Sequence, residues 1–168
     1  MDLKLLEEIL IDQPKYRLSQ VKRAIFYDLI PSWEKATTLP KGLREELKEE
    51  CPIDIDSKIS TSSDENTVKA LITLKDKLNV ETVLMRHKGR NTICVSTQIG
   101  CPLKCSFCAT GKMGFKRNLT MSEIVEQILF FARYLAGSNQ KITNIVFMGM
   151  GEPFLNYENV MDAIRYLK

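Results

Sequence analysis

The strongest constraint on the fold is a repeated order of strand, loop and helix in residues 91–168. A strand-like run, NTICVSTQI, leads into a loop, and a helical run follows between Thr120 and Gly137. Thr120 and Glu123 have the spacing of a capping box, and glycine is a typical helix end. A second apolar run, ITNIVFM, leads through GMGEPFLN to a second helical run, YENVMDAIRYLK. This order predicts the start of a parallel α/β layer, with functional loops after the carboxyl ends of the strands.

The residues before this layer have a different pattern. Leucines at helical spacing, and the run PKGLREELKEECP between two prolines, predict a small helical domain over residues 1–52, with Trp33 in its core. The polar segment 56–66 predicts a linker or loop. The runs VKALITL and VETVLMR, joined by KDKLN, predict a hairpin. We therefore expect a linker and β-hairpin over 53–90, and the α/β core from residue 91.

Two strand–helix units are too few to close a barrel or to cover both faces of a parallel sheet, which is normally buried on both sides. The expected fold class is thus α/β, with a helical N-terminal domain followed by the first two βα units of a partial TIM-like barrel. We expect the 168 residues to be the N-terminal part of a longer protein.

The chain has no sign of a membrane or secreted protein. No apolar run approaches the roughly 18–20 residues that cross a bilayer, and the N-terminus MDLKLLEEIL mixes acids among its apolar residues. We therefore expect a cytoplasmic protein. Its five cysteines then favour metal or redox chemistry over a disulfide framework.

Three of the cysteines, Cys101, Cys105 and Cys108, form the pattern C-x3-C-x2-C. Thiolates hold [4Fe–4S] clusters, and three of them leave one iron open for another ligand. Structural zinc usually takes four protein ligands. Zinc stays open as an alternative, because Cys94 or His87 lies close enough in the sequence to supply the fourth.

Basic residues cluster around these cysteines. No Asp or Glu lies between Arg86 and Arg117, and the segment holds Arg86, Lys88, Arg90, Lys104, Lys112, Lys116 and Arg117. Such a patch suits phosphates. A solvated surface explains it about as well.

The C-x3-C-x2-C pattern, with Phe107 before the last cysteine, resembles the signature of radical S-adenosylmethionine (SAM) enzymes. The wider context TICVSTQIGCPLKCSFCATGKMGFKRNLT, followed by TNIVFMGMGEPFLNYENV, closely resembles the RlmN/Cfr family, which methylates adenosine in RNA. QPKYRLSQVKRAIFYDLI and LPKGLREEL are similar to the small helical domain of that family. The resemblance spans essentially the whole chain, and it makes residues 1–52 an expected RNA-binding-type domain.

The resemblance also implies site residues and partners. Cys101, Cys105 and Cys108 would hold a [4Fe–4S] cluster, Gly151 and Glu152 would hold the amino-acid portion of SAM, and Phe107 would lie beside the cofactors. The implied substrate is the 23S rRNA of the large ribosomal subunit, with tRNA as a further one, and an external electron donor is required. C2 of adenine is the expected target rather than C8, because the helical N-terminal domain is similar to the housekeeping branch.

Two further roles are implied. Glu81 matches the general base that takes the C2 proton, and Cys94 matches the cysteine that resolves a covalent enzyme–RNA intermediate through a transient disulfide. Alternation places Thr92, Cys94, Ser96 and Gln98 on one strand face, which we expect to line the cavity. From the residues alone, the favoured interpretation of Cys94 is a small buried hydrophobe, and that of Glu81 is an exposed hairpin residue.

The family's methyl-carrying cysteine has no counterpart here, because no cysteine follows Cys108. We therefore expect residues 1–168 alone not to complete the reaction. The alternative function is a metal-binding RNA-binding module, with zinc or an iron–sulfur cluster and without catalysis.

Overall fold

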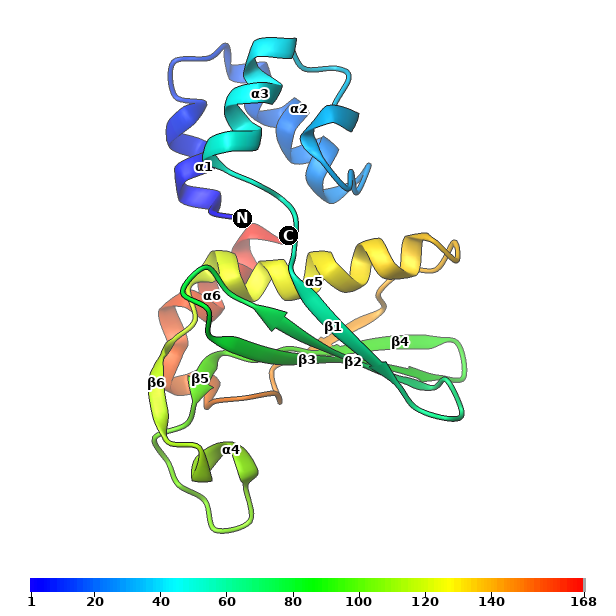
Figure 1. The fold of residues 1–168 in the computed structure, drawn as a ribbon, viewed down its shortest axis with the longest axis vertical. Helices are drawn as coiled ribbons and strands as arrows, with labels where there is room; N and C mark the ends of the chain where they lie inside the picture. Colours follow the sequence, from blue (N-terminus) through cyan, green and yellow to red (C-terminus); the bar gives the residue numbers. More distant parts are fainter. Residues whose placement is uncertain (168) are drawn as a thin grey trace.

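The computed structural model describes residues 1–167, which form a helical part above an open sheet (Figure 1). The helical part consists of α1 (Leu3–Ile9), α2 (Lys15–Phe26), the 3-10 turn η1 (Trp33–Lys35) and α3 (Lys41–Glu50). Trp33 is buried at its centre, and the Trp33 indole donates a hydrogen bond to the Cys51 carbonyl at 2.8 Å. The helices and the core residue Trp33 follow the sequence pattern, although α2 ends before Leu29, which has a φ of 49°.

A five-stranded sheet follows, in the order β1-β2-β3-β4-β7. Its strands are β1 (Ser57–Thr61), β2 (Thr67–Thr73), β3 (Asn79–His87), β4 (Arg90–Cys94) and β7 (Asn144–Val146). The first four pair antiparallel, and β4 pairs with β7 in parallel. The β2–β3 hairpin confirms the sequence pattern. The parallel pair, with α5 (Met121–Ala136) and α6 (Tyr157–Tyr166), is the expected pair of βα units.

Two sequence expectations about the strands are wrong. The polar segment 56–66 is not all loop, because Ser57–Thr61 forms β1. This strand reads as polar because it lies at the sheet edge with most of its residues exposed. The run 91–99 is not one strand either. It breaks after Cys94 and resumes as β5 (Gln98–Gly100), which pairs with β6 (Phe115–Asn118) in a separate two-stranded sheet.

Helix α5 is favoured both by capping residues at its two ends and by an apolar face along its length. Thr120 and Glu123 make the capping box in both directions, and Gly137 is the C-cap residue. The buried face of α5 packs on the sheet through Ile124, Ile128 and Phe131. The opposite sheet face has no helix over it in the described residues (Figure 1).

The helical part is joined to this layer by direct contacts. The Leu3 backbone N–H donates to the Ser122 hydroxyl at 2.9 Å, and the Arg133 guanidinium donates to the Ile53 carbonyl at 2.8 Å. The buried apolar residues of both parts form one continuous cluster. Among residues 1–167, no helix combines the length and apolarity that crossing a membrane requires.

Candidate active site at the carboxyl ends of the parallel strands

Two loops lie beyond the carboxyl ends of β4 and β7: one follows β5, which comes directly after β4 in the chain, and the other leaves β7 itself (Figure 1). The first, residues 100–114, carries the three clustered cysteines and the short helix α4 (Ala109–Lys112); we call it the cysteine loop. The second, residues 147–152, has the sequence FMGMGE; we call it the GMGEP loop, after the motif that it shares with Pro153.

The cysteine loop is closed at its base and open at its tip. Gly100 has a φ of 74°, and a Cβ there would lie 1.7 Å from the Gly114 carbonyl oxygen, so only glycine permits this closure. Cys101 is buried beside this base, whereas Cys105 is exposed and Cys108 is half-buried. Phe107, at the tip, is 90% exposed.

The three thiols are not gathered at a common point. No group of three or more His, Cys, Asp or Glu side chains within residues 1–167 is arranged to hold a metal ion. Hydrogen bonds from the backbone of Gly111 and Thr110 lower the pKa of the Cys108 thiol. The donor set still fits an iron–sulfur cluster, since all three residues are thiols on one short, largely exposed segment.

The zinc alternative loses one of its two candidate ligands. His87 lies at the tip of the β3–β4 hairpin, where it pairs with Arg90. The cysteine loop follows the opposite end of β4. His87 is therefore not positioned to complete a site with the three clustered cysteines.

The GMGEP loop, in contrast, is tightly held by buried polar groups. Gln98, only 1% exposed, accepts a hydrogen bond from the Glu152 backbone N–H at 2.9 Å and donates to the Asn118 side chain at 2.8 Å. The Met150 carbonyl accepts hydrogen bonds from the backbones of Thr97 and Gln98. The Ser96 hydroxyl accepts one from the Met150 N–H at 2.8 Å.

The glycines of this loop are required by packing within the chain. Gly151 has a φ of 98°, and a Cβ there would lie 2.5 Å from Cβ of Gln98. A Cβ on Gly149 would lie 2.6 Å from the Ser96 hydroxyl oxygen. Glu152, the N-cap of the 3-10 turn η2 (Pro153–Asn156), is partly exposed and accepts a hydrogen bond from the Phe154 N–H at 3.1 Å.

Sequence reasoning missed the polar residues that hold this loop, Ser96, Gln98, Asn118 and Gln127. We expected Ser96 and Gln98 to line a cavity, but both are buried. Gln127 joins Ser96 to α5, by accepting from the Ser96 N–H at 2.8 Å and donating to the Ser96 carbonyl at 3.0 Å. The available signal was a run of polar residues, Ser96–Gln98, directly after an apolar strand.

Cys94 and Glu81 lie on the sheet face that no helix covers. Val83 is the register partner of Cys94, and Glu81 lies two residues before Val83 on the same face of β3. Burial raises the pKa of the Cys94 thiol, while a hydrogen bond from the Met148 backbone partly offsets this. The Glu81 side chain is 44% exposed, and its carboxylate forms a salt bridge with Lys69 at 3.0 Å. This setting lacks the burial expected around a base.

Exposed apolar side chains gather on the two loops and the turn that follows. Of fourteen large apolar residues with high exposure, seven lie in residues 103–115 or 148–155: Leu103, Phe107, Met113, Phe115, Met148, Phe154 and Leu155. An apolar concentration of this kind marks a surface that another group covers.

The basic segment between Arg86 and Arg117 does not form one patch. Arg117 makes salt bridges with Asp76 and Glu123, each at 2.8 Å, and these raise its pKa. Lys104, Lys112 and Lys116 lie exposed around the cysteine loop. The remaining three, Arg86, Lys88 and Arg90, lie at the other end of β4.

Comparison with known proteins defines the class of protein. Residues 95–168 match the family model described as "Radical SAM superfamily". The crystal structure of a radical SAM methyltransferase from Sphaerobacter thermophilus superimposes with a TM-score of 0.91 and 41% identity, covering 99% of this chain and 50% of that one. Residues 95–168 are thus similar to the radical SAM superfamily in sequence, and the whole chain is similar to a radical SAM methyltransferase in fold.

The curated relatives narrow this further. A protein of Dictyoglomus thermophilum named "Probable dual-specificity RNA methyltransferase RlmN" is 45% identical over 155 residues. A protein of the same name from Chlorobium phaeobacteroides is 46% identical over 165 residues. They match 92% and 94% of this chain, which spans 44% and 46% of their lengths. Among the curated relatives, the chain is therefore similar to the N-terminal part of RlmN-named proteins and spans about half of their length.

Proposed function

We propose that residues 1–168 are the cluster-binding part of a radical SAM methyltransferase that acts on C2 of adenine in 23S rRNA, and also on tRNA. The observation that carries the proposal is the hydrogen-bonded link between the GMGEP loop and Gln98 of β5, the strand that leads into the cysteine loop. One loop has three thiols without a fourth protein ligand, and the other presents Glu152 from a rigid backbone. The names of the relatives support RNA as the substrate.

Cys101, Cys105 and Cys108 would hold the cluster, and their number leaves one iron open for SAM. When bound, the cluster supplies the electron, received from an external donor, that starts radical chemistry on SAM. The exposed tip of the cysteine loop lets Cys105 and Cys108 turn toward Cys101 without breaking a packed core. Lys104 and Lys112 are exposed on this loop, where their positive charge would favour a negatively charged cluster.

Gly151 and Glu152 would bind the amino-acid portion of SAM. A carboxylate suits an ammonium group, as charge-assisted hydrogen bonds are among the stronger ones. The Glu152 carboxylate is partly exposed, and only one of its oxygens is used by the Phe154 N–H. Gln98 fixes the Glu152 backbone, so binding SAM does not require this loop to become ordered. Phe107 would cover the cofactors from the tip of the cysteine loop.

Cys94 and Glu81 would take part in the reaction of the RNA substrate. Glu81 takes the proton from adenine C2, which requires that its carboxylate leave Lys69. The Cys94 thiolate would attack the sulfur of the cysteine that is joined through a carbon to adenine: the S–S bond forms as the S–C bond breaks, and the carbon keeps the electron pair and takes up a proton to become the methyl group of the released product. A thiol with a raised pKa is protonated at neutral pH, so Cys94 must lose its proton before it attacks.

Cluster binding is tested by anaerobic reconstitution of residues 1–168 with iron and sulfide. We expect a brown, oxygen-sensitive protein whose electron paramagnetic resonance signal, after reduction, changes on adding SAM. A colourless protein with stoichiometric zinc would instead support the non-catalytic RNA-binding module.

Methylation is tested by incubating the reconstituted protein with SAM, a reductant and protein-free rRNA. We expect no C2-methyladenosine from residues 1–168 alone, because no cysteine follows Cys108 within them. In the same assay, we expect the product from a longer form that includes such a cysteine. C8-methyladenosine from that form would contradict the proposed target atom.

A further inference from the structure

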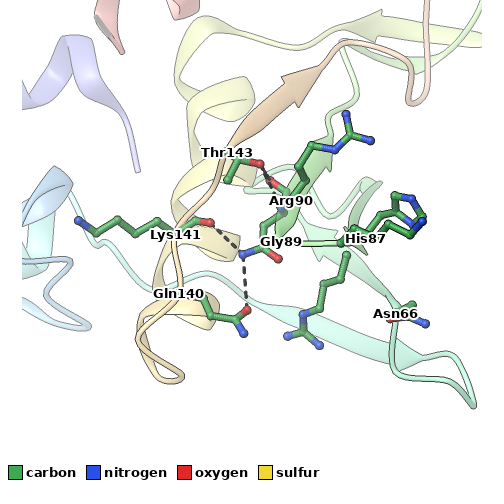
Figure 2. Close-up of a pocket in the computed structure, with 10 residues that line it drawn as sticks. Asn66, His87, Gly89, Arg90, Gln140, Lys141 and Thr143 are labelled. Carbon is green, nitrogen blue, oxygen red and sulfur yellow. Dashed lines mark hydrogen bonds between the residues drawn. The ribbon is translucent and has the colours of Figure 1, made fainter.

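A pocket lies at the opposite end of β4 and β7 from the cysteine loop and the GMGEP loop. It is a cavity of about 430 Å³ between the tip of the β3–β4 hairpin and the connection from α5 to β7 (Figure 2). Its charged lining comes from Arg86, Lys88, Arg90 and Lys141, with His87 beside them. Sequence reasoning joined the first three to the cysteine loop, whereas the fold separates them from it and adds Lys141.

The positive charge of this pocket has no local counter-charge. None of its lining residues is Asp or Glu. Within residues 1–167, none of its four Arg and Lys side chains forms a salt bridge, whereas Arg117 forms two. Charge that the fold leaves uncompensated on a concave surface attracts polyanions.

The framework beneath these cations is rigid. The Asn91 N–H donates to the Thr143 hydroxyl at 3.0 Å, and the Asn91 side chain donates to the Lys141 carbonyl at 2.9 Å. The Thr143 N–H donates to the Asn91 carbonyl at 2.9 Å. The hairpin tip and the α5–β7 connection therefore move as one surface.

Two contacts hold the Arg86 side chain in place at the edge of the pocket. Its guanidinium donates to the Glu65 carbonyl at 3.1 Å and lies 5.7 Å from the centre of the Tyr134 ring. Lys88 and Gly89 form the hairpin turn with positive φ values of 40° and 82°, which leaves the Lys88 side chain exposed.

The directions of the side chains indicate the kind of ligand. Arg90 and Lys141 extend away from each other, on opposite sides of Thr143 (Figure 2). They cannot close on one small anion without leaving these positions. They are placed instead to meet separate phosphates along an extended chain.

We infer that this pocket binds the sugar–phosphate backbone of the RNA, at a position remote from the adenine that reacts. The inference rests on the proposed function for the identity of the polyanion. Because β4 has five residues, the first and last residues of the strand are about 13 Å apart. An RNA that reaches both ends must follow the side of the sheet, so these contacts would orient the substrate without reading its bases.

The test is the affinity of cluster-free residues 1–168 for a fluorescent RNA hairpin, measured by anisotropy from about 50 to 200 mM potassium chloride. The variant is Arg90→Glu with Lys141→Glu, since both side chains are exposed and outside the core. The matched control is Lys58→Glu with Lys75→Glu, which makes the same charge change at exposed positions on β1 and the β2–β3 turn. Arg90→Gln with Lys141→Gln is a milder version that guards against misfolding.

We expect the Glu pair to weaken RNA binding about tenfold or more, a clearly larger loss of affinity than in the control variant. The slope of log Kd against log salt should fall by about one per lost phosphate contact. The Gln pair should show a smaller loss in the same direction. Equal affinity of the pocket variant and the control would overturn the inference. Displacement of the RNA by inorganic phosphate at matched phosphate concentration would also overturn it, since the pocket would then be a small-anion site.

These outcomes separate the inference from the proposed function. If wild-type protein binds the hairpin and the pocket variants do not weaken binding, only the pocket assignment fails. If wild-type protein binds no RNA while cluster reconstitution succeeds, the inference is overturned together with RNA as the substrate. Iron content is measured on separately reconstituted samples of the same variants, and we expect it to be unchanged by the pocket substitutions.

Discussion

The two loops of the candidate active site, one after β5 and one after β7, are held in opposite ways. The GMGEP loop is fixed by Gln98 and Ser96, and its glycines fit against neighbouring atoms within 2.6 Å of where a Cβ would lie. The cysteine loop is pinned at Gly100 and Gly114 but exposes Cys105 and Phe107 at its tip. Contacts within the protein thus fix the conformation of the GMGEP loop, whereas a bound cluster would fix the conformation of the cysteine loop.

The largest effect expected from this difference is on metal binding. Cys105→Ala should reduce the iron content after reconstitution from about four per chain to near zero, because two thiolates cannot retain the cluster. Thermal unfolding of the metal-free protein should be unchanged, since Cys105 is exposed. Iron analysis and the visible absorbance of the cluster measure the first effect.

Cys94→Ala is the control for that experiment, because it removes a thiol from the sheet face instead of the loop. It should leave the iron content unchanged. Equal loss of iron in both variants would show that Cys94 is a cluster ligand and would contradict the assignment of the three ligands.

A large effect on stability is expected in the GMGEP loop. Gly151→Ala introduces a Cβ about 2.5 Å from Cβ of Gln98, at a φ of 98°. The combined clash and backbone strain should cost about 3 kcal/mol in the free energy of unfolding. Urea denaturation of the metal-free protein measures it.

The variant Gly89→Ala separates the cost of backbone strain from the cost of the steric clash that Gly151→Ala also introduces. Gly89 has a similar φ of 82°, but a Cβ there meets nothing within 4 Å. Its cost should therefore be the backbone cost alone, about 1 kcal/mol. If the two variants were equally stable, the GMGEP loop would be less closely packed than the structure shows.

A smaller loss is expected from removing the amide that holds this loop. Gln98→Ala leaves the Glu152 N–H and the Asn118 side chain without their partner, which should cost about 2 kcal/mol of stability. In the reconstituted protein, affinity for SAM should fall as well, because Glu152 loses its fixed position. Gln140→Ala changes an exposed glutamine and should affect neither quantity.

The same contrast explains how much the sequence could predict. The helix α5, its capping box and the hairpin were predictable, because local periodicity and cap residues determine them. The three cysteines were found from their spacing. The strand break after Cys94 was not predictable, because Ser96 and Gln98 continue the alternation and are buried only through partners far along the chain. The same holds for the division of the basic segment, which depends on the pairing of Arg117 with Asp76 and Glu123.

The subtlest expected effect concerns the thiols themselves. Burial raises the pKa of Cys94, so its alkylation by iodoacetamide should be slow at pH 7 and should accelerate until the pH passes that raised value, above 9. Cys105 is exposed in the cysteine loop and should be alkylated much sooner. Mass spectrometry of tryptic peptides from the metal-free protein gives both rates. Equal rates at pH 7 would mean that the uncovered sheet face does not shield Cys94. The raised pKa of Cys94, and the slow formation of its thiolate that follows from it, would then be contradicted.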